Sequence, residues 1–476
     1  MLSGQYDFLV NHMYLTEIIS CILFILPFFF FFFNKKWLYF YYAISIVANL
    51  PLIFVMVFPF SYEAIIVGLL IIQNLRDWIK HKSLRYVTTK ENLFFLVSLF
   101  AILFVNIITS LFNFNKAEVI NRLIIYVVNV LILFLYTFYF KESRQVKFIN
   151  FGILLGGVIL VISMIIELIY GYYTLGVRNM RPAGLLLDPN VCGFSLNIVL
   201  VLSFLERKEN NFFLDLMYIT IRVILVFGIF LTVSRSTYIG TLFILSCYLL
   251  YYSQGKRKWT ASTVTIVLIL MYLVFINPLK NFLKQMYGML DLKRIIPYRE
   301  NLPMPIDNSN NPIITNPDNY DYSNSRITLI IGAAKIFGFN FITGVGIGNV
   351  TTKMYEFTHL KMNAHNLYLQ LLAESGILML IVLLLFAYYF LNLLLKVDKR
   401  FKMTIYILFG LIFIESFFNH NLLNINIIYL TLSIIVSLIT ISSKDKIYLT
   451  ISKNKIHFRK NSNEKRITYR KRENVV

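Results

Sequence analysis

The residues whose types and spacing suit chemistry lie between Gly344 and Gly376, where the longest polar interval of an otherwise apolar chain ends. This segment contains three polar motifs: Gly344-Val-Gly-Ile-Gly-Asn349, Asn363-Ala-His-Asn366 and Glu374-Ser-Gly376. Polar groups at the edge of a membrane helix are costly and usually face a cavity or a partner. Imidazole accepts and returns a proton near neutral pH, so His365 is our candidate general base.

Other interpretations of these residues stay open. A lone histidine at a helix end is often a cap or an interface residue, and His420, in a short bare turn, is a competing base. The glycine run lacks the spacing of a dinucleotide-binding loop. We expect Gly346 and Gly348 to let the backbone approach a bulky ligand closely, with Asn366 as a further weak substrate contact.

Three arginines are candidates for binding an anion, because a guanidinium offers planar paired donors to phosphate oxygens. Arg235 lies between two apolar segments with almost no loop, where an arginine is expensive unless it faces water or a partner. Arg326 is expected at the start of a helix, which itself favours an anion. This helix is predicted to begin at Ser325, and its apolar stripe consists of Ile327, Ile330, Ile331, Ala334 and Phe337. Arg181 stands close to the turn Asp188-Pro-Asn190. The alternatives are snorkelling to the headgroups for Arg181 and a solvated surface charge for Arg326.

Composition sets the class of protein that must position these residues. The 476 residues are 58% hydrophobic and 14% charged, with a mean hydropathy of +0.68, whereas soluble domains average about 45–50% apolar and about 25% charged. Apolar runs near the length needed to cross a bilayer recur along the chain, among them 38–58, 259–276 and 372–395. We predict an all-α polytopic integral membrane protein with 12–13 transmembrane helices and a large extracytoplasmic loop that carries an amphipathic helix.

The formal charge of +21 indicates orientation rather than nucleic-acid binding. Basic residues gather in loops on alternate sides of successive apolar runs and in the tail, which marks those parts as cytoplasmic. The predicted organisation has four parts: N-terminal transmembrane helices (1–276), an extracytoplasmic loop (277–371), C-terminal transmembrane helices (372–442) and a basic cytoplasmic tail (443–476). The three cysteines show neither metal-ligand nor disulfide spacing, and no cluster predicts a metal or cofactor.

Taken in order, several motifs resemble the O-antigen ligase and polymerase superfamily of bacterial membrane enzymes. The motifs that carry this resemblance are Arg181-Pro-Ala-Gly184, Asp188-Pro-Asn190, Ser234-Arg-Ser236, Arg326, the run Gly344–Asn349, and Ala364-His-Asn-Leu-Tyr-Leu-Gln-Leu-Leu-Ala-Glu-Ser-Gly376. The resemblance covers about 160–380. It implies metal-independent, inverting glycosyl transfer on the outer face of the cytoplasmic membrane, from a glycan linked through pyrophosphate to undecaprenol. The family pattern of two arginines and a histidine falls on Arg235, Arg326 and His365.

Within that superfamily we favour a polymerase that joins lipid-linked repeat units into an O-antigen or a capsule. A ligase that transfers a finished glycan to another acceptor is the first alternative. A flippase or polysaccharide exporter is an alternative from another class, although transporters usually place charged residues near the bilayer midplane. The expected partners are the undecaprenyl-pyrophosphate-linked oligosaccharide and the lipid bilayer. A flippase and a chain-length regulator are further candidate partners.

Overall fold

The structure is a computed structural model that describes residues 13–55, 57–58, 61–81, 83–112, 116–170, 182–205, 212–252, 322–358, 360, 362–395, 397, 399–420, 422–443, 446–452 and 455–461. Arg181, the predicted span 259–276 and most of the predicted extracytoplasmic loop lie outside these residues. The helices of the bundle are α2 (Met13–Phe33), α3 (Lys35–Ala48), α4 (Pro51–Val55), α5 (Tyr62–His81), α6 (Lys90–Phe112), α7 (Lys116–Tyr139), α8 (Ser143–Tyr170), α9 (Pro189–Leu202), α10 (Phe212–Leu231), α11 (Arg235–Tyr252), α16 (Leu367–Leu395), α17 (Lys399–Ser416) and α18 (Asn426–Ser442).

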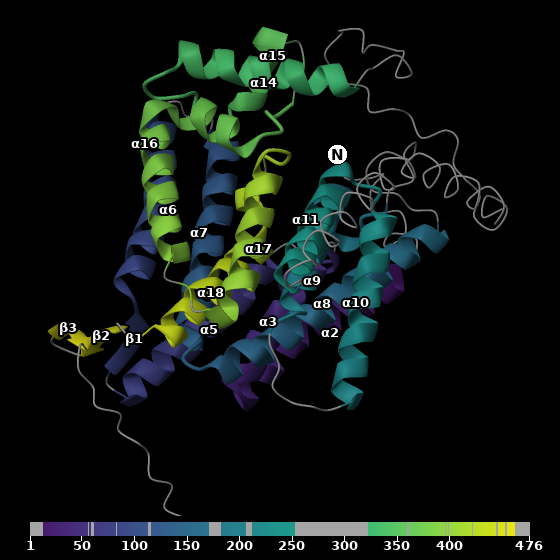
Figure 1. Ribbon diagram of the computed structural model, residues 1–476, viewed down its shortest axis with the longest axis vertical. Coiled ribbons are helices and arrows are strands. Elements are labelled where there is room, and N and C mark those ends of the chain that lie inside the picture. Colours follow the sequence, from purple (N-terminus) through teal and green to yellow (C-terminus); the bar gives the residue numbers. More distant parts are fainter. Residues whose placement is uncertain are drawn as a thin grey trace, which may run out of the picture.

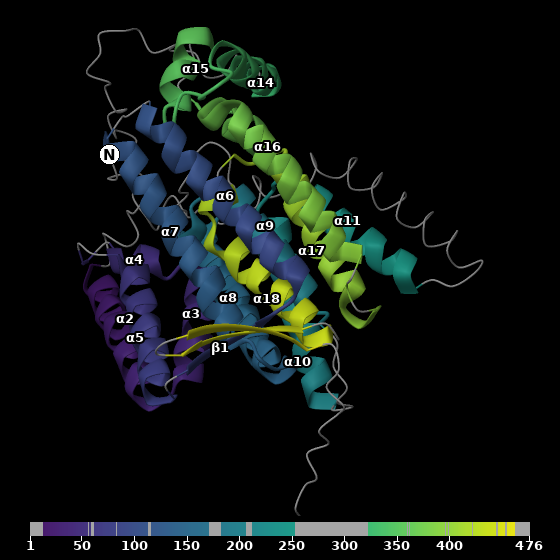
Figure 2. The ribbon, with the colours of Figure 1, turned by 90° about the vertical axis from the view of Figure 1, so that its left-hand side faces the viewer.

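Two further helices form a cap over one end of the bundle. These are α14 (Tyr322–Phe339) and α15 (Val350–Thr358), which pack on each other and on the N-terminal part of α16 (Figures 1 and 2). The 3₁₀ turns η1 (Gly184–Leu186) and η3 (Leu422–Asn424) lead into α9 and α18. We call the end of the bundle beneath α14 and α15 the cap end.

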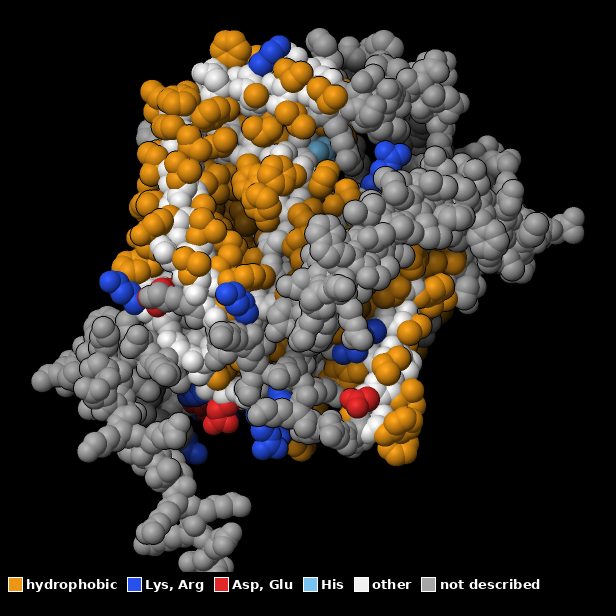
Figure 3. Space-filling view, in the orientation of Figure 1, with side chains coloured by type: hydrophobic (Ala, Val, Ile, Leu, Met, Phe, Trp, Pro, Cys, Tyr) orange, Lys and Arg blue, Asp and Glu red, His pale blue; other side chains and the backbone are white. Residues whose placement is uncertain are grey.

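Six of the described helices are long and apolar enough to cross a membrane: α2, α6, α7, α8, α10 and α16. Their flanks carry exposed hydrophobic side chains. In Figure 3 hydrophobic side chains cover the left-hand side of the bundle, and most of the charged side chains that can be seen lie towards the end opposite the cap. Such a surface suits lipid. The predicted class, a helical multi-pass membrane protein, is confirmed; the total of 12–13 spans remains a prediction.

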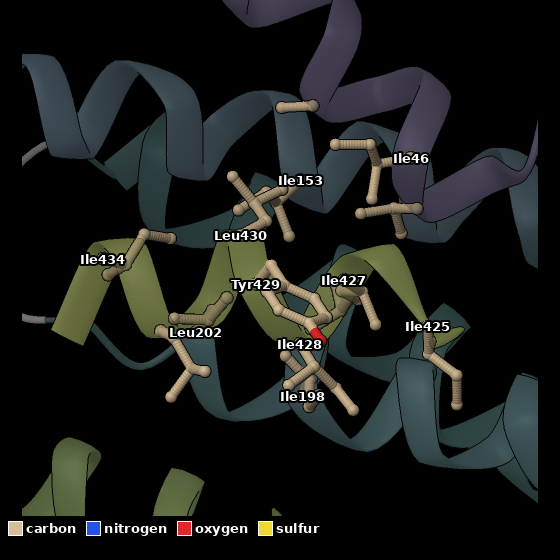
Figure 4. Close-up of a cluster of buried hydrophobic side chains, with 14 of the residues drawn as sticks. Ile46, Ile153, Ile198, Leu202, Ile425, Ile427, Ile428, Tyr429, Leu430 and Ile434 are labelled. Carbon is tan, nitrogen blue, oxygen red and sulfur yellow. The ribbon is translucent and has the colours of Figure 1, made fainter. Parts of the chain in front are cut away.

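Helix α18 forms the centre of the bundle. Every residue from Ile427 to Thr440 is buried, as expected for a helix that is apolar on all sides. Figure 4 shows Ile428 and Tyr429 among side chains from neighbouring helices, including Ile46 of α3, Ile153 of α8 and Ile198 of α9. This packing joins the N-terminal helices to the C-terminal ones.

A small antiparallel sheet, which the sequence did not predict, lies at the end opposite the cap. Its order is β1 (Ser83–Thr88), β2 (Lys446–Ser452) and β3 (Lys455–Asn461). Ser83 pairs with Ser452 and Thr88 with Ile447. The alternating Ile447, Leu449 and Ile451 are typical of a strand. The sheet joins the first part of the predicted tail to the loop after α5.

Several helix boundaries differ from those predicted. The run 38–58 is interrupted after α3, because Asn49 adopts a left-handed conformation (φ 53°) and ends the helix. Helix α14 begins at Tyr322 rather than Ser325. The predicted span 372–395 begins earlier, at Leu367, where the Asn366 side chain accepts a hydrogen bond from the Leu369 amide.

The apolar residues of α14 occupy two faces rather than one. Leu329, Ala333 and Ile336 are buried against the rest of the cap, whereas Ile327 and Ile331, on the predicted apolar stripe, are about half exposed. The stripe read from the sequence is therefore not the face that packs on the protein.

Candidate functional site

The imidazole rings of His365 and His420 meet at the cap end. Their centroids are 5.1 Å apart and their planes cross at 81°, which is an edge-to-face contact. His365 lies in the short segment before α16, and His420 lies between α17 and η3. The interpretation of His420 as a residue in a bare turn is wrong, because this contact joins it to the candidate base.

The backbone of His365 adopts an uncommon conformation. Its φ angle is +51°, in the left-handed region that residues other than glycine seldom occupy. Such a residue persists only where its surroundings hold it, and such residues cluster at functional sites. The conformation therefore adds to the reasons for treating His365 as a positioned group rather than a plain helix cap.

The electrostatic surroundings keep His420 neutral. Burial, followed by the nearby His365 and Arg122, lowers the pKa of His420 to about 3. The ring is therefore neutral near neutral pH. Neither ring nitrogen has a hydrogen-bond partner among the residues that the structure describes.

Glu374 connects three segments around the histidine pair. Its carboxylate accepts hydrogen bonds from the Gly348 amide (3.2 Å) and from Nε2 of Gln370 (2.8 Å). It also lies 3.9 Å from the guanidinium of Arg122 on α7, with Glu374 1% and Arg122 15% exposed. A buried carboxylate needs such partners, because removing an ion from water is costly.

Gln370 extends this network to the histidine segment. Its Oε1 accepts a hydrogen bond from the Ala364 amide (3.1 Å), and its Nε2 also donates to Oδ1 of Asn363 (3.3 Å). Both residues immediately precede His365 in the chain. The Arg122–Glu374–Gln370 network therefore sets the path of the backbone that carries the candidate base.

The glycine run interlocks with a break in α16. Gly376 has φ 65° and ψ −154°, which interrupts the helix. The Val345 and Gly346 amides donate to the carbonyl oxygens of Ala373 and Glu374 (2.9 and 2.8 Å), and the Ile377 amide donates to that of Phe341 (2.7 Å). These bonds satisfy backbone groups that the break leaves free.

This interlock gives the glycines a structural role. A Cβ atom on Gly344 would lie 2.3 Å from the backbone of Glu374, and one on Gly376 would lie 2.5 Å from the carbonyl oxygen of Ile342. The close backbone approach predicted for the run is thus made, at Gly344, to the protein itself. Contact of Gly346, Gly348 or Asn366 with substrate stays a prediction.

The C-terminal part of α6 supports the same break through hydroxyl and amide side chains. Ser375 donates to Oδ1 of Asn106 (2.7 Å) and accepts from Thr109 (3.1 Å). Ser110 accepts from the Ile347 amide (3.3 Å). Three polar residues at i, i+3 and i+4, on one face of a membrane helix, thereby hold the glycine run and the kink together.

A second group of motifs assembles around the start of α11. Ser234 donates to Oδ1 of Asn190 (2.7 Å), and Asp188 caps α9 by accepting from the Asn190 amide (2.8 Å). Ser234 also accepts a hydrogen bond from the Thr237 amide (3.4 Å) at the start of α11. The motifs Asp188-Pro-Asn190 and Ser234-Arg-Ser236, 44 residues apart, are therefore neighbours. Arg235 begins α11 with an exposed side chain.

The segment before α9 is fixed by an acidic residue of α8. The buried Glu167 accepts hydrogen bonds from the amides of Ala183 and Gly184 (2.8 and 2.6 Å). This contact positions Pro182-Ala-Gly184, the part of the arginine-proline motif that the structure describes. The side chain of Arg181 is not among the described residues.

Contacts between α11 and α17 relate Arg235 to the histidine pair. Gly240 of α11 faces Leu411 of α17, and Gly410 faces Phe243. The start of α11 therefore lies beside the later part of α17, which leads to His420. Arg235 and the histidine pair share the cap end of the bundle.

The structure thus brings together only some of the predicted site residues. His365, Gly348 and Asn366 lie in or beside the Glu374 network, and Arg235 belongs to the neighbouring group. Arg326 lies on α14, four residues after its first residue, so it is not at the helix start; its side chain lies outside the description.

Sequence reasoning missed Arg122 and gave Glu374 no role of its own. Arg122 was counted within an apolar span, although a lone arginine inside such a run is itself a signal of function. Glu374 was noted only as part of a motif. Within the described part of the chain, no group of three or more His, Cys, Asp or Glu residues is arranged to hold a metal ion.

A comparison with protein families matches one part of the chain. Residues 221–384 match the family described as O-antigen ligase. This segment contains Arg235, α14, the glycine run and His365, and the match supports the O-antigen ligase/polymerase superfamily for this part of the chain. The matched family implies an enzyme of the glycosyl-transferring kind, and the long apolar helices indicate a multi-pass membrane protein. A comparison with curated proteins found no match.

Proposed function

We propose that this chain is a polymerase of surface polysaccharide, which joins polyprenyl-pyrophosphate-linked repeat units into a longer lipid-linked glycan. The observation that carries the proposal is the histidine site at the cap end, built by Arg122, Glu374 and Gln370 within and beside the matched segment. The donor, undecaprenyl pyrophosphate bearing an oligosaccharide, follows from the resemblance to the superfamily. Its acceptor is a second lipid-linked unit.

The reaction transfers one glycosyl group. A hydroxyl oxygen of the acceptor sugar attacks the anomeric carbon of the donor, on the face opposite the leaving group, so the configuration inverts. A carbon–oxygen bond forms, and the bond from the anomeric carbon to the phosphate oxygen breaks with its electron pair. His365 takes the proton of the attacking hydroxyl. The pyrophosphate departs as an anion.

Arginine side chains suit the leaving group. Charge develops on the departing pyrophosphate, and fixed cationic donors beside it stabilise the transition state more than the ground state. Arg235 and Arg326 are the proposed donors, with Arg181 as a weaker third. Support for Arg235 comes from its exposed side chain at the start of α11, which lies at the same end of the bundle as His365.

The proposed orientation places the cap end outside the cell. Exposed basic residues mark the other end, among them Lys36 at the start of α3, Lys90 at the start of α6 and Arg144 at the start of α8. Basic residues beside membrane helices favour the cytoplasmic side. The enzyme then works on the outer face of the cytoplasmic membrane, where lipid-linked glycans rather than nucleotide sugars are the donors.

A ligase is the second candidate, because the matching family is described by that activity. Glycan profiling of a deletion strain separates the candidates. Single repeat units at the cell surface support a polymerase. Long chains that remain on the lipid carrier indicate a ligase, and lipid-linked units that stay inward-facing indicate a flippase.

A further inference from the structure

His420 presents a polar ring whose partners are not found in the protein as described. Its two nitrogens are buried, and neither has a hydrogen-bond partner among the described residues. Buried polar atoms are nearly always hydrogen-bonded, so an exception calls for a physical explanation. Its ring meets another polar ring, that of His365, edge to face at 5.1 Å.

The proposed role of His365 as a base gives His420 a hydrogen-bond partner at the stage when His365 is protonated. Neutral imidazole has one N–H donor, whereas imidazolium has two. When His365 takes a proton on the ring nitrogen that faces the acceptor hydroxyl, the N–H on its other nitrogen becomes part of a cation and a stronger hydrogen-bond donor. A neighbouring ring with an unused lone pair accepts that hydrogen bond after a small rotation of either ring.

We propose, resting on the proposed function, that His420 is the positioning partner of His365 and accepts a hydrogen bond from the imidazolium that forms during glycosyl transfer. His420 gains and loses no proton in this role. It lowers the energy of the protonated base and holds its ring towards the acceptor hydroxyl.

The charges around the pair fit this assignment. Arg122 of α7 faces His420 and opposes a second positive charge there, and together with burial and His365 it lowers the pKa of His420 to about 3. Glu374 of α16 lies beside Arg122 and offsets its charge. His420 therefore stays neutral and able to accept a hydrogen bond near neutral pH, and a proton taken from substrate resides on His365.

Three substitutions separate the possible roles of the ring. His420→Phe keeps an aromatic ring against His365 but removes both nitrogens. His420→Asn and His420→Gln remove the ring but place a neutral amide oxygen near the position of one nitrogen or the other. A matched control is His81→Phe, at the last residue of α5, beside the strand end of the molecule.

The experiment uses purified full-length protein in liposomes and, as substrate, lipid-linked single units extracted from the deletion strain. We expect His420→Phe to lose roughly 10- to 100-fold in rate, the range for one hydrogen bond to a charged group. At least one of the two amide variants should recover most of that loss. His81→Phe should match the wild type.

The pH profile gives a readout that packing alone would not move. Loss of the acceptor makes the His365 imidazolium less stable, so the pKa of His365 falls and the acidic limb of the rate profile moves to lower pH in His420→Phe. The amide variant that recovers activity should restore the limb. Thermal unfolding of each variant identifies any that fails to fold.

The outcomes distinguish this inference from the proposed function. A folded His420→Phe with wild-type rate and an unmoved acidic limb overturns the role of His420. Loss of activity in all three folded variants also overturns it. An acceptor oxygen would then not replace the ring, and His420 would have to gain and lose a proton itself. A wild-type protein that elongates no lipid-linked unit contradicts the proposed function instead, whatever the His420 variants do.

Discussion

Gly344 packs against the backbone of Glu374 so closely that a Cβ atom would lie 2.3 Å from the Glu374 carbonyl group. Because this contact joins the glycine run to the break in α16, the path of the chain before the break depends on it. His365 lies eleven residues before Gly376, on the segment that this break and the Gln370 hydrogen bonds hold in place.

Gly344→Ala should therefore destabilise the protein and lower its activity. The left-handed backbone (φ 65°) alone costs about 1–2 kcal/mol for alanine, and the clash with backbone atoms adds to that. Gly338→Ala is the matched control, since nothing lies within 4 Å of its added Cβ atom; there a gain of about 0.5–1 kcal/mol is expected. Thermal unfolding in detergent measures both. Equal stability of the two variants would contradict the interlock.

The contacts of Glu374 predict a large effect of its removal. Glu374→Ala leaves the partly buried Arg122 without this carboxylate and should cost about 3 kcal/mol of unfolding free energy. The control is Glu356→Ala, which breaks an ion pair with Lys353 whose side chains are 43% and 51% exposed; its cost should be at most about 1 kcal/mol. Chemical or thermal unfolding of purified protein compares them. Similar losses for both would show that the Arg122 contact contributes little.

Arg235→Lys and Arg326→Lys should each lose most polymer-forming activity while reaching the membrane at normal levels. Lysine keeps the charge but cannot make a planar, paired contact with phosphate oxygens. Arg181→Lys should have a milder effect. Arg144→Lys, at an exposed position at the start of α8, serves as the control. Activity is read from the length of glycans in complemented deletion cells, and near-normal polymer from the first two variants would remove these arginines from the pyrophosphate site.

Labelling of single cysteines should place the cap outside the cell. After replacement of Cys21, Cys192 and Cys247, an impermeant thiol reagent should label Tyr355→Cys on α15 in intact cells. It should label Glu142→Cys, before α8, only after the cells are opened. The reverse pattern would overturn the orientation and the proposed mechanism.

The sequence predicted the features that depend on local composition and periodicity. Apolar runs located most of the long helices, and Asn363-Ala-His-Asn366 was correctly placed at the entrance of a membrane helix, now α16.

Features that depend on distant contacts were not predicted. His420 meets His365, and Arg122 meets Glu374, across 55 and 252 residues of chain, and no spacing rule relates such pairs. The break at Gly376 also escaped notice, because a single glycine in an apolar run does not show whether the helix continues through it. Pairing of β1 with β2 likewise joins two segments more than 350 residues apart.

The most direct test of the central claim is glycan elongation by purified His365→Ala. Lipid-linked single units from the deletion strain serve as substrate, and products are resolved by length. Loss of a general base commonly lowers the rate about 10²–10⁴-fold, so the wild type should build a ladder of chains while His365→Ala leaves single units. A folded His365→Ala protein that builds chains at the wild-type rate would contradict the assignment of His365 as the base.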